Sequence, residues 1–475
     1  MKYIATIGME VHAELKTNSK MFCACKNDPE EKSPNKNICA VCTGHPGALP
    51  VINEEAVRLV QRVGLAVGGT VQKQTHFDRK NYFYPDLPKG YQISQYQHPL
   101  VWGGAINGVN ITRVHLEEDT ARNIHEAGST LVDFNRSSVP LMELVTEPDL
   151  TNAADARKFC EELQLILQYI GASDANMEKG QMRCEANISI HPEGQKEYGT
   201  KVEVKNINSF RAVEMAIIYE LKRQEEAIEK GEKIIQETRG WDENKQITFS
   251  QRTKESAHDY RYFPEPDLPP LEFTDIYIEE LRSTIPELPA GKRVRLKDEY
   301  GVPGGLVETL VRERALASFW EHMISELKEW ESEKFKEAMI LASNYFTSDL
   351  LGLMKEKNIT ADKLLLEPEN FAELIKMIVR NEISSRVAKD VLRHMVEVGG
   401  DPSTIVEDKG LKQVSDTGAL EEIAKRIIEA NPKPVADYKA GKEQALQALV
   451  GQMMKETKGA ANPAVIKDVL TNLIK

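Results

Sequence analysis

The spacing of hydrophobic and polar residues divides the chain into regions with different predicted secondary structure. Residues 1–293 contain short runs in which apolar and polar positions alternate, a pattern typical of β-strands, at 3–7, 111–116, 188–191 and 201–204. Longer stretches with apolar residues at helical spacing predict helices at 54–67, 153–170 and 210–230. Because strands and helices follow one another in irregular order, we expect an α+β domain rather than a repeating βαβ fold.

From residue 294 onward the pattern becomes helical. Amphipathic stretches predict helices at 306–323, 335–344, 372–379 and 384–398, and the sequence Gly-Gly-Asp-Pro at 399–402 is a strong stop. A small helical unit follows, with helices expected at 418–430, 435–440, 441–455 and 462–474. The sequence therefore predicts an α+β domain at 1–293, an all-α helical domain at 294–407 and a small helical tail at 408–475.

The composition is that of a soluble globular protein, with 41% hydrophobic and 28% charged residues in 475. The N-terminal sequence lacks the apolar core of a signal peptide, and no apolar run approaches membrane-spanning length, so we expect a cytoplasmic protein. The net charge of −13 argues against coating nucleic acid by bulk electrostatics. Residues 408–475 hold 11 Lys/Arg and 9 Asp/Glu, a net of +2, which makes the tail the better suited segment for a phosphate backbone.

Four of the six cysteines fall within twenty residues, at Cys23, Cys25, Cys39 and Cys42. Six cysteines in this length are too few for a disulfide scaffold, so their clustering points to a metal. Two short pairs separated by a 13-residue insert suit a closed tetrahedral zinc site, which would be structural because it leaves no open position for substrate. The alternative is two reduced cysteine pairs without metal, since Cys-x-Cys is tighter than the usual finger spacing.

Acidic residues and histidines form three further clusters in the first 150 residues. Glu10 and His12 share one face of a predicted strand, Glu117–Glu118–Asp119 follow His115, and Glu143 interrupts an apolar run. Oxygen ligands with one imidazole are what a magnesium–phosphate site uses. For each cluster the alternative is structural, a surface pair or a solvated turn.

Several cations could hold phosphates or a carboxylate substrate, namely Arg79, Lys80, Lys89, Arg183 and Lys205. Ordinary ion pairing in an acidic chain is the alternative for each of them. Arg79, Lys80 and Lys89 bracket the segment 82–88, whose aromatic-proline-acid sequence is similar to that of 260–269.

The sequence contains no phosphate-binding P-loop, no dinucleotide fingerprint, no His-Glu-x-x-His and no serine nucleophile elbow. Cys160 lies in a helical run and is interpreted as a core residue.

Long motifs that follow one another in order span essentially the whole chain. They are GMEVHAEL at 8–15, RKNYFYPD at 79–86, YQISQ at 91–95, LMELVTEPD at 141–149, DYRYFPEPD at 259–267, LVGQMMK at 449–455 and KGAANP at 458–463. In these motifs the sequence resembles the B subunit of the tRNA-dependent amidotransferases of the GatCAB type.

The resemblance implies a cradle-shaped α+β domain, a helical domain and a tail related to YqeY proteins that contacts tRNA. It implies that ATP phosphorylates the side-chain carboxylate of glutamate or aspartate wrongly esterified to tRNA(Gln) or tRNA(Asn). Ammonia, released from glutamine by an A subunit, then displaces phosphate and gives Gln-tRNA or Asn-tRNA. A small C subunit would complete the heterotrimer.

The resemblance also implies roles for individual residues. His12, Glu118 and Glu143 match the magnesium ligands, Glu10 matches a ligand of a second, ATP-dependent ion, and Lys89 and Lys205 are candidates for phosphate or aminoacyl contacts. Strand alternation by itself does not choose Glu118 over Glu117, whose side chains should point in opposite directions. Two other functions stay open: a zinc-stapled tRNA-binding protein without catalysis, and a magnesium-dependent hydrolase that needs no tRNA.

Overall fold

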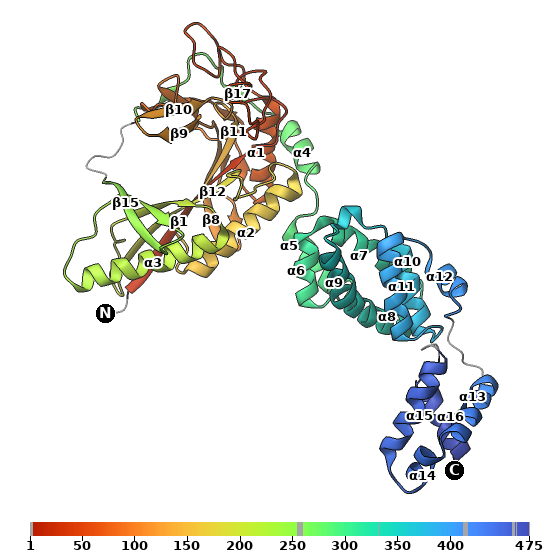
Figure 1. The fold of residues 1–475 in the computed structure, drawn as a ribbon. Helices are drawn as coiled ribbons and strands as arrows, with labels where there is room; N and C mark the ends of the chain where they lie inside the picture. Colours follow the sequence, from red (N-terminus) through yellow and green to blue (C-terminus); the bar gives the residue numbers. More distant parts are fainter. Residues whose placement is uncertain are drawn as a thin grey trace. The chain divides into compact units, whose positions relative to one another are not determined.

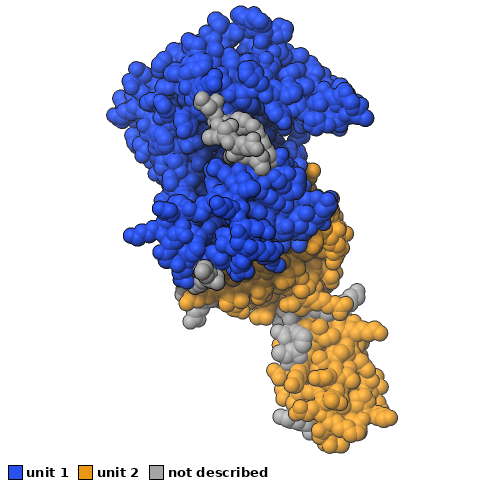
Figure 2. Space-filling view, turned by 90° about the vertical axis from the view of Figure 1, so that its left-hand side faces the viewer, with its two compact units in different colours: residues 1–289 blue, residues 290–475 orange. Residues whose placement is uncertain are grey.

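A computed structural model describes residues 3–253, 260–330, 332–411, 417–457, 461 and 463–474. Asp259, residues 458–460 and Asn462, which belong to the motifs quoted above, lie outside the described residues. The chain forms two compact units, residues 1–289 and 290–475 (Figure 2). Within the described residues, none of the helices has the length and hydrophobicity needed to cross a membrane.

The first unit is built around a large sheet (Figure 1). Its strands are β1 (Tyr3–Glu14), β2 (Thr70–Val71), β6 (Val101–Trp102), β7 (Ala105–Ile106), β8 (Val109–Glu118), β11 (Pro140–Thr146), β12 (Met182–Pro192), β13 (Val202–Ile207), β14 (Glu237–Asp242) and β15 (Ile247–Thr253). They lie in the order β15-β14-β13-β12-β1-β11-β8-β6-β2, and β7 pairs with β8 off this path. β13 and β14 pair in parallel, whereas the other neighbours are antiparallel. Three of the predicted strands are confirmed as parts of β1, β8 and β12, and the fourth, 201–204, begins one residue before β13.

The two faces of this sheet differ in polarity. On β1, Met9, Val11 and Ala13 are buried in the hydrophobic core, whereas Glu10 and His12 alternate with them and lie on the other face. The apolar face is covered by α1 (Glu54–Ala66), α2 (Ala153–Ile170) and α3 (Phe210–Glu229), which contact β8, β1 and β12 (Figure 1). One face therefore builds the core, and the opposite face is left for polar side chains.

The three covering helices begin where their sequences provide a cap. The side chains of Asn53, Asn152 and Ser209 each accept a hydrogen bond from a backbone N–H of the first helical turn. α2 ends at Gly171, whose φ of 76° is the left-handed conformation that glycine adopts without steric cost. The predicted helices at 54–67, 153–170 and 210–230 are confirmed to within two residues.

Short strands beside the large sheet form three small sheets. They are β3 (Gln74–Thr75) with β17 (Leu271–Glu272), β9 (Arg122–Glu126) with β10 (Ser129–Asp133), and β4 (Asp78–Asn81) between β5 (Tyr91–Ser94) and β16 (Phe263–Pro264). The pairing of β16 with β4 brings the two similar aromatic-proline segments side by side, with ring centroids of Tyr82 and Tyr260 6.0 Å apart. Helix α4 (Asp275–Ser283) follows, and α5 (Pro289–Asp298) begins at the boundary of the two units.

Within the described residues, the regular secondary structure of the second unit is entirely helical. Its elements are α6 (Gly304–Arg312), α7 (Arg314–Leu327), α8 (Ser332–Asn344), a π-helix (Tyr345–Leu350), α9 (Leu351–Lys357), a 3-10 turn (Ala361–Lys363), α10 (Pro368–Val379), α11 (Ser385–Val398), α12 (Pro402–Asp408), α13 (Thr417–Ala430), α14 (Pro432–Lys439), α15 (Glu443–Glu456) and α16 (Pro463–Ile474). The prediction of one helix over 306–323 was wrong, because Glu313 adopts an extended conformation (φ −116°, ψ 91°) and separates α6 from α7. The other helical predictions in this region are confirmed.

The last four helices have a hydrophobic core of their own. Leu420 on α13, Leu449 and Met453 on α15 and Leu470 on α16 are fully buried and belong to one cluster, which contains no residue before position 420. Among the described residues, the tail is thus stabilised by apolar contacts within its own cluster.

Candidate functional site

Charged residues gather on the polar face of the large sheet, where strand register brings them opposite one another. His12 on β1 pairs with Glu143 on β11, and Glu143 pairs in turn with His115 on β8. On the other side of β1, Glu10 pairs with Glu185 on β12. Residues directly opposite in an antiparallel sheet project from the same face, so residues far apart in sequence converge here.

His12 lies at the centre of this group. Its Nε2 atom is 3.4 Å from a carboxylate oxygen of Glu143 and 3.8 Å from oxygens of both Glu117 and Glu10. The Nε2 atom of His115 lies 3.2 Å from Glu143, so this carboxylate contacts two imidazoles. His115, Glu117 and Glu143 are all buried, at 2%, 2% and 6% exposure.

Glu118 does not join this group. Its two carboxylate oxygens lie 2.6 and 2.7 Å from the ammonium group of Lys89, and one of them accepts a hydrogen bond from the backbone N–H of Ile93. Glu117 instead accepts a hydrogen bond from Ser94 and faces His12. The adjacent carboxylates separate because successive side chains of β8 project from opposite faces.

Two overlapping sets of ligand atoms could each hold a metal ion. His12, Glu117 and Glu143 form one set and Glu10, His12 and Glu185 the other, and the atoms of each set lie within 4.8 Å of one another. Carboxylate oxygens with one imidazole match the ligands of a hard divalent cation, and a nucleotide's phosphates supply further oxygens in such sites. The residues present therefore fit magnesium by their chemistry.

Burial and neighbouring charges shift the pKa values of this group in opposite directions. Burial on its own would lower the pKa of His12, but the hydrogen bond and charge of Glu143 raise it to about 9. Burial would raise the pKa of Glu143, but the charges and hydrogen bonds of His115 and His12 hold it well below its usual value. The pKa of Glu10 is raised to about 7, by burial first and then by the charges of Glu143 and Glu185. Shifted pKa values in a group of neighbouring carboxylates and histidines are typical of a site that binds a cation.

Cationic side chains border the group. Lys205 Nζ lies 2.7 Å from Glu185 and 3.5 Å from Glu203, beside the second set of ligand atoms. The Arg113 guanidinium lies 4.0 Å from Glu143. Burial opposes the charged form of Lys80, yet its pKa is raised, chiefly by the charge of Glu117. These cations stand where the oxygens of a phosphate would need partners.

Aromatic rings from the second aromatic-proline segment, from β5 and from Tyr96 just after β5 lie beside the charged group. The rings of Tyr96 and Tyr262 stack at 4.6 Å, and the Arg113 guanidinium lies 5.8 Å from the Tyr96 ring. Arg79 binds Glu265 through two hydrogen bonds of 2.7 Å each and lies 4.2 Å from the ring centroid of Tyr91. The segment 260–269 therefore lies beside the charged group, held there by the contacts of Tyr262 and Glu265.

Three residues of the site received no role from the resemblance, namely His115, Glu117 and Glu185, although the first two belong to one of the predicted acid–histidine clusters. A signal existed for two of them, because alternation along the strand places His115 and Glu117 on one face. Glu185 had no such signal, since its proximity to Glu10 follows from pairing across 175 positions of the chain. Of the predicted residues, the structure brings Glu10, His12 and Glu143 together and places the Lys89–Glu118 pair elsewhere.

The four clustered cysteines come together in space. Their sulfur atoms all lie within 4.8 Å of one another, and Cys39 Sγ is 3.9 Å from Cys42 Sγ. A tetrahedron with Zn–S bonds of about 2.3 Å has edges of about 3.8 Å, so the arrangement fits a zinc ion. The pKa of Cys42 is lowered to about 5, first by its hydrogen bond with Cys23 and further by the charge of Lys20, against the effect of burial. Cys160 is fully buried, which confirms it as a core residue.

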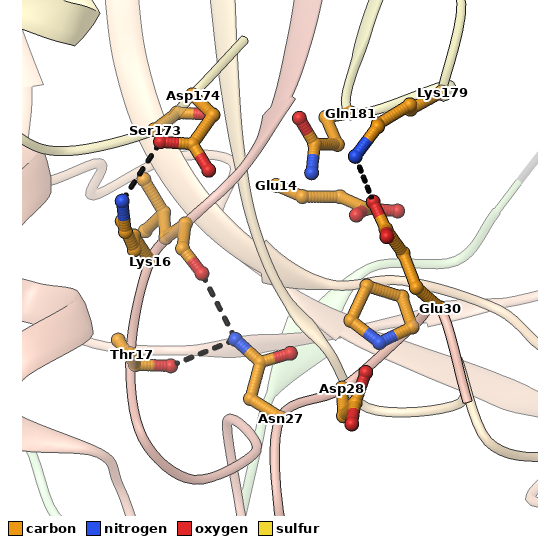
Figure 3. Close-up of a pocket in the computed structure, with 12 residues that line it drawn as sticks. Glu14, Lys16, Thr17, Asn27, Asp28, Glu30, Ser173, Asp174, Lys179 and Gln181 are labelled. Carbon is orange, nitrogen blue, oxygen red and sulfur yellow. Dashed lines mark hydrogen bonds and ion pairs between the residues drawn. The ribbon is translucent and has the colours of Figure 1, made fainter. Parts of the chain in front are cut away.

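A polar cavity of about 320 Å³ lies near the end of β1 (Figure 3). Figure 3 shows Glu14 beside the ion pair of Lys179 with Glu30, at 2.8 Å, and the ion pair of Lys16 with Asp174, also at 2.8 Å. The pKa of Glu14 is raised to about 7, by burial first and then by the charge of Asp119. The cavity is lined by other residues than the metal-ligand sets and is distinct from them.

Comparisons with known proteins cover almost the whole chain. The family model described as the GatB/GatE catalytic domain matches residues 5–279, and the one described as the GatB domain matches residues 332–474. Three similar proteins are each named as the B subunit of an aspartyl/glutamyl-tRNA(Asn/Gln) amidotransferase. That of Caldicellulosiruptor saccharolyticus is 46% identical over 99% of this chain and 98% of its own length. Those of Persephonella marina and Thermotoga maritima are 45% and 44% identical, each over the full length of both chains.

Proposed function

The chain belongs to the B-subunit family of the aspartyl/glutamyl-tRNA(Asn/Gln) amidotransferases, and we propose on this basis that it is the subunit that amidates misacylated tRNA. Its substrates are Glu-tRNA(Gln), Asp-tRNA(Asn) or both, and its products are the matching Gln-tRNA(Gln) and Asn-tRNA(Asn). The reaction is that of a ligase, in which ATP activates a carboxylate and ammonia replaces the activated oxygen.

The observation that carries this proposal is the set formed by His12, Glu117 and Glu143 on the polar face of the sheet. These three ligand atoms lie within 4.8 Å of one another, and Lys80 and Arg113 stand beside them. Phosphoryl transfer depends on positioning and on charge stabilisation, for which such a set of ligands and cations is suited. A tRNA-binding protein without catalysis would have no use for buried carboxylates held against two imidazoles.

The chemistry divides into two balanced steps. A side-chain carboxylate oxygen of the esterified amino acid attacks the γ-phosphorus of ATP, the bond to the β,γ-bridging oxygen breaks, and ADP leaves. Ammonia then attacks the carbonyl carbon of the acyl phosphate, the carbon–oxygen bond to phosphorus breaks, and phosphate leaves. The nitrogen gives up one proton, and the amide remains esterified to the tRNA.

The side chains of the site divide between holding metal and orienting phosphates. We assign His12, Glu117 and Glu143 to one magnesium ion and Glu10, with Glu185, to a second ion that arrives with ATP. Magnesium, when bound, offsets the charge of the phosphate oxygens as the γ-phosphoryl group is transferred.

Lys205 and Lys89 are assigned different roles in the phosphorylation step. Lys205, 2.7 Å from Glu185, is placed to meet phosphate oxygens that approach the second ion. Lys89 is assigned to holding Glu118, and through it the end of β8, rather than to a direct phosphate contact.

The partners follow from the family. We propose that a glutaminase A subunit supplies ammonia and that a small C subunit completes a heterotrimer, in keeping with the absence of a serine nucleophile elbow from this sequence. The cradle-like first domain would receive the aminoacylated end of the tRNA, and the tail, residues 408–475, would contact the tRNA elsewhere. The complex would act in the cytoplasm, where tRNA is aminoacylated.

The decisive test uses the reconstituted three-subunit complex with Glu-tRNA(Gln), glutamine and labelled ATP. We expect ADP release that depends on the misacylated tRNA, together with Gln-tRNA(Gln). Glu143→Gln should abolish ADP release and leave tRNA binding unchanged. ADP release without tRNA would support a magnesium-dependent hydrolase, and no ADP release by the parent complex would support a zinc-stapled tRNA-binding protein. Full activity of Glu143→Gln would overturn the assigned site.

A further inference from the structure

Lys20 is a completely buried lysine, with 0% of its surface exposed. A lysine is almost never fully buried unless its charge has a partner. Its Nζ atom lies 3.7 Å from the sulfur of Cys42 and 3.1 Å from the backbone oxygen of Phe134. Among the described residues, no carboxylate forms an ion pair with Lys20. The side-chain atom that contacts the buried ammonium group is therefore a cysteine sulfur.

Cys42 is the cysteine best supplied with hydrogen-bond donors. Besides the Lys20 ammonium group, the backbone N–H of Cys39 points at its sulfur at 3.2 Å. Cys42 is also the member of the cluster that is fully buried, at 0% exposure. A buried sulfur that accepts from an ammonium and an amide is surrounded as a thiolate would be.

We propose that Lys20 is the outer-sphere cation of a metal centre formed by Cys23, Cys25, Cys39 and Cys42, and that it strengthens the binding of zinc there. Four thiolates around a divalent ion leave two negative charges uncompensated, and in a buried site this charge needs a cation nearby. Residues that contact metal ligands in this way typically change metal affinity when they are removed. The proposal does not depend on the amidation reaction, because it concerns only the cysteine loop.

The position of Lys20 also ties the cysteine loop to the chain that leads into β11. Its ammonium group holds the backbone oxygen of Phe134, and the hydroxyl of Ser137 donates to the backbone oxygen of Cys42 at 2.8 Å. The backbone N–H of Met21 donates to the backbone oxygen of Ser138. A metal centre with Lys20 in place would thus join two segments of the first unit.

The proposal is tested by the zinc affinity of Lys20→Met, measured by competition with a chromophoric chelator on the full chain. Methionine is an unbranched side chain one atom shorter than lysine, and it carries no charge. We expect an affinity about 10- to 100-fold weaker, the usual effect of losing an outer-shell partner. The matched control is Lys32→Met, which removes a charge from an exposed position of the same loop and should change the affinity less than about twofold.

Thermal melting separates this role from simple packing. Metal-free Lys20→Met should melt lower than the metal-free parent, because the backbone oxygen of Phe134 loses its ammonium donor, but the loss should be larger in the zinc-loaded form. The rise in melting temperature on adding zinc should be smaller for Lys20→Met than for the parent. An equal loss of stability in the metal-free and zinc-loaded forms, or an unchanged zinc affinity, would overturn the proposal.

Cobalt offers an independent readout that does not require an affinity to be fitted. Cobalt bound to four thiolates shows sulfur-to-metal charge-transfer bands, whose energy depends on the charge carried by each sulfur. Loss of the ammonium donor in Lys20→Met should shift these bands, whereas Lys32→Met should reproduce the parent spectrum. A spectrum of Lys20→Met identical to that of the parent would contradict an outer-sphere role.

Discussion

The ammonium group of Lys89 lies 2.6 Å from one carboxylate oxygen of Glu118 and 2.7 Å from the other, an ion pair that is almost completely buried. The next residue back along β8, Glu117, faces His12 on the opposite side of the strand. Two adjacent carboxylates thus have different surroundings: Glu118 contacts Lys89 and the backbone of β5, and Glu117 belongs to one of the candidate sets of ligand atoms.

Substitution of these two carboxylates should affect ADP release differently. Glu117→Gln removes a metal ligand, so we expect ADP release of the folded protein to fall at least about 100-fold. Because Glu117 is buried beside Lys80 and His12, a loss of stability should accompany it. Glu118→Gln leaves the Lys89 charge buried without its partner and should lower the free energy of unfolding by about 3 kcal/mol. Thermal melting and magnesium-dependent ADP release of both variants provide the measurement.

The comparison of the two variants is internally controlled, because each changes one carboxylate to the same amide at neighbouring positions. The assignment of Glu117 fails if Glu118→Gln, in its folded fraction, is the variant that loses ADP release. It also fails if Glu117→Gln remains fully active.

Gly44→Ala should displace Lys89, because the added methyl group would collide with its side chain. Gly44 has a φ of +69°, and a Cβ atom there would lie 2.8 Å from Lys89 Cγ and 3.1 Å from its backbone nitrogen. We expect the free energy of unfolding to fall by about 2–3 kcal/mol, from backbone strain and from displacement of Lys89. Gly47→Ala is the matched control, since Gly47 also has a positive φ, +85°, but nothing within 4 Å of its Cβ position. Equal losses in chemical denaturation would show that the contact with Lys89 is unimportant.

Glu265→Gln should loosen the link between the two aromatic-proline segments. Glu265 is 3% exposed and binds Arg79 through both oxygens, so the substitution breaks a buried, bidentate pair and should cost about 3 kcal/mol. Asp267→Asn removes a more exposed partner of the same guanidinium, at 3.2 Å, and should cost less than about 1 kcal/mol. Urea denaturation of both variants measures the difference, and a larger effect of Asp267→Asn would contradict the expected order.

The metal-free protein should lose stability as the pH rises. The pKa of His12 is raised from 6.5 to about 9 in the folded state, so its contribution is complete below pH 6.5 and is lost as the pH rises through 9. The pKa of Glu10 is raised from 4.5 to about 7 in the folded state. Between these pH values the folded protein holds a proton that the unfolded chain has lost, so stability falls as the pH rises through this range. We expect a loss of about 2 kcal/mol between pH 6.5 and 9 in the presence of a chelator.

Melting temperatures across this pH range, for the parent and for His12→Gln, provide the measurement. The variant should show a flatter dependence on pH, because it lacks the imidazole that gains a proton on folding. Magnesium should oppose the loss, since the metal binds the neutral imidazole and its affinity rises with pH. A parent whose stability increases from pH 6.5 to 9 without metal would contradict the pKa values.

The helices could be predicted because their information is local. Hydrophobic periodicity and the caps Asn53, Asn152 and Ser209 lie within each segment, and the predicted ends agree with α1, α2 and α3. The break at Glu313 was missed because no glycine or proline marks it, and the flanking residues continue the helical pattern.

The site was less predictable because it depends on which strands become neighbours. Glu10 and His12 could be recognised together from their alternation, but their contacts with Glu185 and Glu143 follow from pairings over more than a hundred residues. The resemblance selected Glu118 as a metal ligand, a choice that strand alternation did not support, whereas the structure places Glu117 beside His12 and Glu118 against Lys89. The burial of a lysine beside Cys42 likewise has no local signal.

The register of β1 with β11 and β12 has a consequence for how such chains can vary in length. Inserting or deleting one residue within one of these strands would turn the later side chains of that strand to the opposite face. In β1, such a change before position 12 would exchange His12 for a core residue. Changes in the connecting turns would leave the pairing intact. Length variation among related chains should therefore concentrate between strands such as β9 and β10, and sequences that differ in length inside β1 would no longer be expected to carry out the reaction.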